Sequence, residues 1–430
     1  MACDGCDGYR RLTRRQLLGR AVEGGGACFL GLLTPRILYA RPDAKSRHTA
    51  DSIIILWMGG GMSHLDTFDP QPGADHGGPF EAIATAAEGI RISEHLPRIA
   101  EQFKHLSLIR TMTSNEADHG RATYLMHTGY PQIPSMQHST LGSIAAQQLG
   151  RGAKDPNLPP YVNIGISWAA GYLGPKYAPF EIGNPDNAMM DMRYHRDVGA
   201  ERFENRLRLV DALDRSFRTK HPKNAAMAGY AHAYNAALLM MRPETAGVFD
   251  LRREPDRIRQ AYGLRDAFGQ GCLLARRLVE NGVRFVEVAL GGWDTHQQNF
   301  TQVEALSARL DEAVSTLIQD LRSRGLYERT MIVLASEFGR TPRINEQSGR
   351  DHYSQCWSAV VGGGGVRGGR IVGRSDKGRA VDARPVQVGE LHATICHALG
   401  IDAAKKNYSD GRPFRVVKDE NAKPIAELFT

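Results

Sequence analysis

Acidic and histidine side chains recur directly after apolar segments of this chain. The groups are His64, Asp66 and Asp69; Ser114, Asp118 and His119; Asp294 and His296; Ser336 and Glu337; and Asp351 and His352. Imidazole nitrogens favour Zn, Fe or Mn, and carboxylate oxygens favour Mg, Ca or Mn. The side chains therefore predict a site for one or more divalent metal ions, either Zn or one of Mn, Mg and Ca.

Asp294 and His296 have the clearest spacing for metal binding. They stand two residues apart in an extended stretch, so their side chains point to the same side. Together with His352 they can form a three-ligand site that leaves one position for water. The further candidate metal ligands are His64, Asp66 and Glu337. Two ions about 3.5–4 Å apart would clamp the attacking and leaving oxygens of a phosphoryl or sulfuryl transfer.

Most of these residues also have an ordinary structural explanation. His64 follows a glycine turn and would cap a loop, and Asp66 fits an Asx turn or a helix N-cap. His119 would simply open the helix that follows it. Asp294 and His296 flank no evident helix start, so the structural explanation is weakest for this pair.

Six short apolar segments would position these side chains. They are residues 52–57, 105–110, 161–164, 283–290, 330–335 and 358–361. Helical patterns alternate with them at residues 119–128, 139–150, 201–217, 224–241, 255–261, 266–281, 299–324 and 388–399. This alternation predicts an α/β fold, with a mostly parallel central sheet and helices on both faces. Ligands bind such sheets at the carboxyl ends of the strands, which is where the acidic and histidine side chains stand.

The first 40 residues read as an export signal. Residues 13–19 contain the pair Arg14 and Arg15, and a weakly apolar stretch follows at residues 27–33. This pattern predicts recognition by the twin-arginine export machinery and a periplasmic or extracellular location; an amphipathic N-terminal helix is the alternative. We assign residues 41–430 to one α/β domain, with a helix-rich insertion or cap over about 165–260.

The composition excludes several classes of protein. Of the 430 residues, 42% are apolar and 23% are charged, which is ordinary for a globular chain and argues against wholesale disorder. The net charge of +7 is not gathered into a basic run with interleaved aromatic residues, so we expect no nucleic-acid partner. No run of 18 apolar residues occurs, so we expect no stable membrane span in the mature chain.

Five motifs carry a resemblance to a known family. They lie at residues 57–70, 119–129, 292–299, 336–342 and 349–352. They are similar to motifs of the DUF1501 family, a group of exported proteins that resembles the alkaline phosphatase and sulfatase superfamily. The resemblance spans about residues 50–402, and it implies an alkaline phosphatase-like fold.

The resemblance also implies roles for individual residues. It assigns metal binding to Asp66, Asp294, His296, Glu337 and His352. Phe338 stands where the superfamily commonly has a metal-binding histidine, so a second metal would lose a ligand.

The nucleophile departs from the superfamily pattern. Sulfatases carry Cys or Ser nine residues before the Thr of a Thr-Gly pair, and counting back from Thr128 reaches His119. A formylglycine derived from Cys is therefore excluded at that place. The open candidates are Ser114 or Thr113, His119 as a phosphohistidine former or a metal ligand, and a metal-activated water with no covalent step.

A substrate anion would need a positive partner. Arg340 is the catalytic candidate for this role, because guanidinium binds sulfate or phosphate oxygens bidentately. Arg121 and Arg343 also follow the ends of predicted strands and are further candidates. Two functions stay open. One is an exported metal-dependent hydrolase of sulfate or phosphate esters, including those on glycans; the other is a non-catalytic binding protein with a degenerate site.

Overall fold

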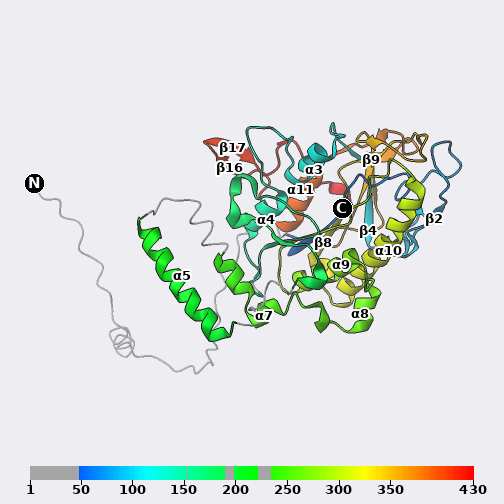
Figure 1. Ribbon diagram of the computed structural model, residues 1–430. Coiled ribbons are helices and arrows are strands. Elements are labelled where there is room, and N and C mark those ends of the chain that lie inside the picture. The colour runs from blue at the N-terminus through cyan, green and yellow to red at the C-terminus, as the bar shows by residue number, and fades with distance from the viewer. Residues whose placement is uncertain (1–47, 153, 189–197, 221–233) are drawn as a thin grey trace, which may run out of the picture. The chain divides into compact units, whose positions relative to one another are not determined.

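The computed structural model describes residues 48–152, 154–188, 198–220 and 234–430 (Figure 1). The predicted export signal lies outside these residues, as do residues 189–197 and 221–233 of the predicted insertion. Residues Ser46–Thr430 form one unit by their internal contacts. Among the helices in the described ranges, none is long and apolar enough to cross a membrane.

A nine-stranded sheet carries the fold, in the order β12-β4-β11-β8-β1-β7-β5-β6, with β15 also paired to β4. Its strands are β1 Ser52–Trp57, β4 Leu106–Thr113, β5 Tyr161–Ile164, β6 Phe180–Ile182, β7 Phe285–Ala289, β8 Thr330–Ala335, β11 Trp357–Gly362, β12 Ile371–Val372 and β15 Val386–Gln387. All six predicted strands are present. The pairings are parallel except those of β11 with β4 and β8, so the mostly parallel sheet is confirmed.

The antiparallel direction of β11 follows from the chain between β8 and β11. A parallel return needs a crossover of a dozen or more residues, usually a helix. Residues 336–356 instead form a loop and a short hairpin, in which β9 (Gly339–Arg340) pairs with β10 (His352–Tyr353). The chain therefore re-enters the sheet from the end at which it left.

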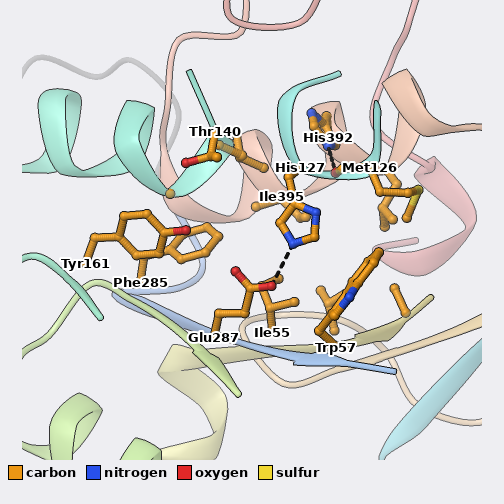
Figure 2. Close-up of a pocket in the computed structure, with 15 residues that line it drawn as sticks. Ile55, Trp57, Met126, His127, Thr140, Tyr161, Phe285, Glu287, His392 and Ile395 are labelled. Atoms are coloured by element: carbon orange, nitrogen blue, oxygen red, sulfur yellow. Dashed lines mark hydrogen bonds and ion pairs between the residues drawn. The ribbon is translucent and has the colours of Figure 1, made fainter. Parts of the chain in front are cut away.

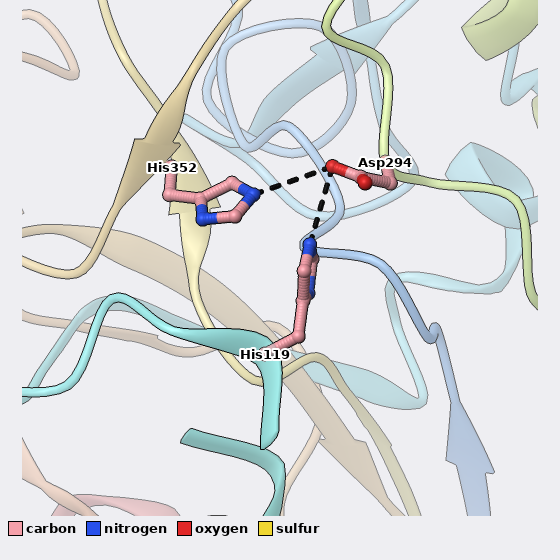
Figure 3. A group of neighbouring side chains, drawn as sticks. All are labelled: His119, Asp294 and His352. Carbon is pink, nitrogen blue, oxygen red and sulfur yellow. Dashed lines mark hydrogen bonds and ion pairs between the residues drawn. The ribbon is translucent and has the colours of Figure 1, made fainter. Parts of the chain in front are cut away.

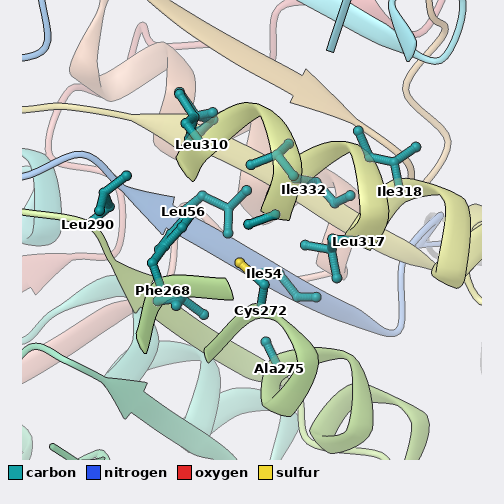
Figure 4. Packing of buried hydrophobic residues seen from close by; sticks show 14 of the residues in the cluster. Ile54, Leu56, Phe268, Cys272, Ala275, Leu290, Leu310, Leu317, Ile318 and Ile332 are labelled. Atoms are coloured by element: carbon teal, nitrogen blue, oxygen red, sulfur yellow. The ribbon is translucent and has the colours of Figure 1, made fainter. Parts of the chain in front are cut away.

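Helices cover both faces of the sheet, as the sequence predicts. The α-helices are α2 Pro97–Gln102, α3 His119–Thr128, α4 Leu141–Leu149, α5 Ala200–Lys220, α7 Pro243–Ala246, α8 Asp256–Ala261, α9 Ala267–Glu280, α10 Asn299–Ser323 and α11 Val388–Leu399. On one face, α9 and α10 pack on Ile54 and Leu56 of β1 (Figure 4). On the other, α4 and α11 pack on Ile53 and Ile55. Two-sided burial explains why β1 is apolar at nearly every position.

Three further ribbons lie outside the main sheet. They are β2 (Ala82–Ala84) with β3 (Arg91–Ser93), β13 (Arg374–Ser375) with β14 (Val381–Ala383), and β16 (Lys406–Ser409) with β17 (Arg412–Arg415). Short 3-10 helices occur at Gly171–Leu173, Pro175–Tyr177, Pro185–Asn187, Leu251–Arg253, Tyr327–Arg329 and Ala426–Leu428.

The start of α3 matters most for the site. The Asp118 carboxylate accepts a hydrogen bond from the backbone N–H of Arg121 and so caps the helix. His119 is the first residue of the helix, and Gly129 ends it with a positive φ of 73°. Because β4 runs to Thr113, three residues beyond the predicted end, the chain delivers α3 to the carboxyl edge of the sheet.

Candidate metal centre

Four side chains meet at the carboxyl edge of the sheet, and Figure 3 shows three of them, His119, Asp294 and His352. His119 opens α3 after β4, Asp294 and His296 lie in the loop after β7, and His352 lies in β10. The ligand atoms of His119, Asp294 and His352 all lie within 4.8 Å of one another. The sheet thus brings together residues that are up to 233 positions apart in the sequence, as the rule for parallel strands predicts.

One oxygen atom, Oδ1 of Asp294, is the centre of this cluster. The Nε2 atoms of His119 and His296 each lie 3.2 Å from it, and Nε2 of His352 lies 3.4 Å from it. The Nε2 atoms of His296 and His352 are 3.0 Å apart. Ligand atoms on a tetrahedral zinc ion lie about 3.3–3.4 Å apart, given bonds of about 2.0–2.1 Å. These distances are close to those within a metal's ligand set. The group in which every ligand atom lies within 4.8 Å of every other is His119, Asp294 and His352, and His296 contacts two of its members.

The other ring nitrogen of each histidine is already bonded. Each Nδ1–H donates to a nearby oxygen: His119 to Glu337 Oε1 at 2.8 Å, His296 to Asp351 Oδ1 at 2.9 Å, and His352 to the Ala117 carbonyl at 2.8 Å. Such partners fix the tautomer and leave the Nε2 lone pair for a metal. Nε2 of His119 is buried and makes no well-formed hydrogen bond within the described chain. These donor atoms fit a divalent cation.

At neutral pH, the protonation states of Asp294 and His352 favour the binding of a cation, whereas that of His119 opposes it. Burial alone would raise the pKa of Asp294, but the hydrogen bond and charge of Arg340 outweigh it and lower that pKa to about 2. Burial lowers the pKa of His352, which keeps its ring neutral. The hydrogen bond to Glu337 raises the pKa of His119, so a proton competes with a metal at this ring.

Glu337 stands behind the cluster. Its side chain is buried, and Oε1 accepts from both His119 Nδ1 and the backbone N–H of Gly60, the latter at 2.9 Å. Gly60 has a φ of +116°, and a Cβ there would lie 2.5 Å from the backbone nitrogen of Asp294. Only glycine lets the loop after β1 approach the Asp294 loop this closely. Glu337 therefore orients a ligand of the cluster.

Arg340 holds Asp294 in place. It is fully buried, and its Nη2 lies 2.6 Å from Asp294 Oδ1. Its other bonds go to the carbonyl oxygens of Gly60, Gly61 and Arg350. Four of the five N–H donors of a guanidinium are thereby used. The role predicted for Arg340, bidentate binding of a substrate anion, is incompatible with this bonding.

Arg121 and Arg343, the other two arginine candidates, lie in different surroundings. Arg121 is two residues from His119 on α3, and positions i and i+2 of a helix do not face each other; its Nε pairs with Glu116 at 2.9 Å. Arg343 is exposed in the loop whose Asn345 donates to the carbonyl of His296 at 3.0 Å. Arg343 therefore lies in a loop that contacts the backbone of His296.

Phe338 fills the space beside the histidines. It is fully buried, and its ring centroid lies 5.0 Å from that of His119 and 4.7 Å from that of His352. Phe338 has no donor atom, so it adds no ligand to the cluster.

Three candidates from the sequence, Asp66, His64 and Ser114, lie in other bonding networks. The Asp66 carboxylate pairs with Arg350, which is fully buried, at 2.8 Å and also accepts from Asn299. His64 is buried, and its Nε2 bonds to the Gly378 carbonyl at 2.8 Å. The oxygens of Asp66 are therefore already bonded. His64 Nδ1 has no hydrogen-bond partner in the described chain, but neither residue belongs to the group His119, Asp294 and His352.

Ser114 lies at the end of β4, and its hydroxyl is bonded locally. It accepts from the backbone N–H of Glu116 at 3.2 Å. Asp351 was noted with His352 in the sequence, but no role as a ligand or as a partner of a ligand was assigned to it. An acid next to a candidate ligand is the signal that would have found it, because metal-binding histidines commonly donate to a carboxylate.

The comparisons with known proteins agree with the motifs. The model of a family described as "Protein of unknown function (DUF1501)" matches residues 50–429. The chain belongs to the DUF1501 family. This confirms the family inferred from the five motifs. A search of curated proteins gave no match.

Several solved structures align with this DUF1501 chain. The PsFucS1 sulfatase from Pseudoalteromonas sp. is 12% identical, with 88% of this chain and 73% of that chain covered and a TM-score of 0.41. A protein in the alkaline phosphatase superfamily from Vibrio parahaemolyticus is 11% identical, with 84% and 68% covered and a TM-score of 0.36. Alkaline phosphatase from the Antarctic bacterium TAB5 is 14% identical, with 75% and 94% covered and a TM-score of 0.34.

Proposed function

We propose that this protein is an exported metal-dependent hydrolase of sulfate or phosphate esters. The observation that carries the proposal is the convergence of three Nε2 atoms on Asp294 Oδ1, while each Nδ1 is bonded to an oxygen. His119, Asp294, His296 and His352 would hold one divalent cation. A divalent cation supplies polarisation of an ester oxygen and activation of water.

The donor set favours a particular group of metals. Three imidazole nitrogens and one carboxylate oxygen suit Zn, Mn or Fe, whereas Mg and Ca prefer sites made of oxygen. Of the metals that the sequence left open, we therefore propose Zn or Mn.

His119 acts as a ligand in this proposal. Its Nδ1 is committed to Glu337, and its Nε2 faces Asp294 Oδ1, so no nitrogen is left to attack an ester. Hydrolysis would then proceed with activated water and without a covalent step. Arg343 would bind the substrate anion, and Arg340 would position Asp294.

A second function is favoured by the number of protein ligands. Catalytic zinc sites commonly have three protein ligands and an open position, whereas structural sites have four. Four side chains of this protein meet at Asp294 Oδ1. If all four bind at once in a tetrahedral site, no position is left for substrate, and the protein is a non-catalytic metal-holding or binding protein.

One experiment separates the two functions. The metal content of the purified protein is measured, and the same sample is assayed with nitrophenyl phosphate, nitrophenyl sulfate, and sulfated and phosphorylated oligosaccharides. A hydrolase binds metal and cleaves at least one ester class. Bound metal with no turnover on any ester supports the binding protein, and no bound metal contradicts both.

Matched variants test the individual roles. His119→Ala should reduce turnover by about 10²-fold or more, whereas His397→Ala, at an exposed position of α11, should not. Arg343→Gln should raise KM and leave metal content unchanged. Arg121→Gln is its control, because it removes a similar exposed charge that points away from the cluster.

A further inference from the structure

A cavity of about 40 Å³ lies beside the last turn of α3, between the sheet and helices α3, α4 and α11 (Figure 2). Its walls are mostly apolar, from Ile55, Trp57, Met126, Phe285 and Ile395. Two histidines and an acid, His127, His392 and Glu287, also line it. Burial lowers the pKa of His392 to about 4, so this ring is neutral at pH 7. His127 lies eight residues after His119, so about 12 Å along the helix separates this cavity from the metal centre.

His127 and Glu287 share a proton. His127 Nδ1 lies 2.7 Å from the Thr123 carbonyl, which can only accept, so Nδ1 carries a hydrogen. His127 Nε2 lies 2.6 Å from Glu287 Oε1, a contact that requires a hydrogen between the two atoms. Whether that hydrogen belongs to the ring or to the carboxyl group, the pair as a whole has no net charge.

The second oxygen of Glu287 is an acceptor in either state. As part of a carboxylate or as the carbonyl oxygen of a carboxylic acid, Oε2 can only accept. Glu287 is 1% exposed, and in the described chain no hydrogen bond reaches this oxygen. This oxygen is therefore an acceptor available to a donor in the cavity.

Two neighbouring side chains, Tyr161 and Asn163, also lack a hydrogen bond of good geometry in the described chain. Tyr161 is 1% exposed and lines the cavity. Its hydroxyl lies beside the side chains of Thr140 and Asn163, which partly offset the rise in pKa caused by burial, but it makes no hydrogen bond of good geometry in the described chain. Asn163 is fully buried, stands opposite Glu287 in the pairing of β5 with β7, and has neither amide atom bonded in the described chain. An acceptor, a hydroxyl and an amide thus lie on one face of the sheet.

We propose that this cavity is a second binding site, for an uncharged molecule of about three or four non-hydrogen atoms that bears a hydroxyl or amide group. The size follows from the volume, since one water needs about 10–15 Å³. The lack of charge follows from the neutral His127–Glu287 pair, because a buried ion without a counter-charge is costly. The hydroxyl or amide supplies the donor that Glu287 Oε2 lacks, and the apolar walls receive the carbon atoms.

Trp168 covers the site from the loop that follows β5. Its ring centroid lies 4.1 Å from that of His127, while Trp57 contacts the same imidazole at 4.4 Å. Both indoles therefore pack on the His127 ring.

The test uses the full-length protein with ethanol and xenon as probes. Ethanol has a hydroxyl and three non-hydrogen atoms, and xenon has no donor. The methyl group of Met126 lines the cavity, so its NMR signal reports occupancy by either probe. We expect a saturable ethanol-induced shift of this signal, and crystals soaked in ethanol should show its oxygen within hydrogen-bonding distance of Glu287 Oε2.

Variants separate hydrogen bonding from shape. Tyr161→Phe removes one hydroxyl and should weaken ethanol binding by about 2- to 10-fold, the worth of one hydrogen bond, and should leave xenon binding unchanged. Tyr262→Phe is the control, because Tyr262 is equally buried but its hydroxyl donates to Asp320 at 3.1 Å, away from the cavity. Val333→Ile adds one methylene to the lining and should weaken both probes.

Three outcomes would overturn the proposal. They are ordered water that ethanol does not displace, equal ethanol binding in Tyr161→Phe and the parent, and tighter binding of xenon than of ethanol. The first would make the cavity a site for water alone. None of these outcomes depends on the metal centre.

Discussion

His296 Nε2 and His352 Nε2 lie 3.0 Å apart, while the Nδ1 of each ring donates to an oxygen. Two neutral rings in this arrangement face each other with lone pairs, which repel. A cation between the rings removes the repulsion. A proton would bridge only these two rings. A metal ion bound to His352 would also bind Asp294 Oδ1 and His119 Nε2, which lie in the same cluster. The relationship between the two rings is therefore the strongest reason to expect a metal.

The first prediction concerns metal content. We expect about one divalent cation per chain, and His296→Ala should lose most of it because one of four ligands is gone. His296 is partly exposed, so the variant should fold. Metal analysis of the parent, His296→Ala and the control His397→Ala checks this. Chelation should lower the Tm of the parent, since a ligand at 100 times its Kd stabilises by about 2.7 kcal/mol. Equal metal content in all three proteins would contradict the assignment of His296 as a ligand.

The second prediction concerns Asp351. The hydrogen bond from His296 lowers the pKa of this carboxyl group, so it is ionised at neutral pH and holds the ring. Asp351→Asn should weaken metal binding by about 10- to 100-fold, the usual effect of removing such a partner. Asp382→Asn, which removes an exposed acid paired with Arg374, should have no effect. Competition with a metal-sensitive dye measures both affinities, and identical values would contradict the role of Asp351.

The third prediction concerns stability against pH. Arg276 is fully buried and pairs with Glu254 at 2.8 Å, as well as with Glu280 and Asp320. Burial alone would raise the pKa of Glu254, but Arg276 and Arg277 outweigh it and lower that pKa. A lowered carboxyl pKa contributes stability above the unfolded value, about 4.3, and this contribution is lost as the pH falls through the folded value.

Glu254→Gln should therefore destabilise the protein at pH 7. The loss should be below the about 3–5 kcal/mol of a fully broken buried pair, because Arg276 keeps two other partners. The difference from the parent should begin to shrink below the unfolded value of about 4.3 and should disappear only as the pH falls through the lower pKa of the folded state. Denaturant unfolding at several pH values measures it. A difference that is constant from pH 7 to pH 3 would rule out the ion pair as its cause.

The fourth prediction concerns export. Arg14→Lys with Arg15→Lys should retain the protein in the cytoplasm, because the twin-arginine machinery reads the paired guanidinium groups. Cell fractionation of the double variant and the parent measures this. A matched change of Arg10 and Arg11 to Lys should leave export intact. Normal export of the Arg14, Arg15 variant would exclude this route.

The sequence by itself determined the elements of this protein. Continuous apolar runs such as 52–57 and 330–335 predict buried strands, and the helical range 119–128 coincides with α3. These signals are local, since periodicity and capping act over a few residues. The grouping of Asp294, His296 and His352 was also accessible, because parallel strands present their carboxyl ends at one edge.

Only the tertiary structure decided what each polar side chain bonds to. Asp66 pairs with Arg350, 284 positions away, and Arg340 pairs with Asp294, 46 positions away. Both arginines had the residue type for binding a substrate anion, but their guanidinium groups are buried and therefore must be neutralised within the protein. His119 faces the cluster because α3 begins at the sheet edge. Such long-range pairings depend on which strands are neighbours, and no local pattern in the sequence contains that information.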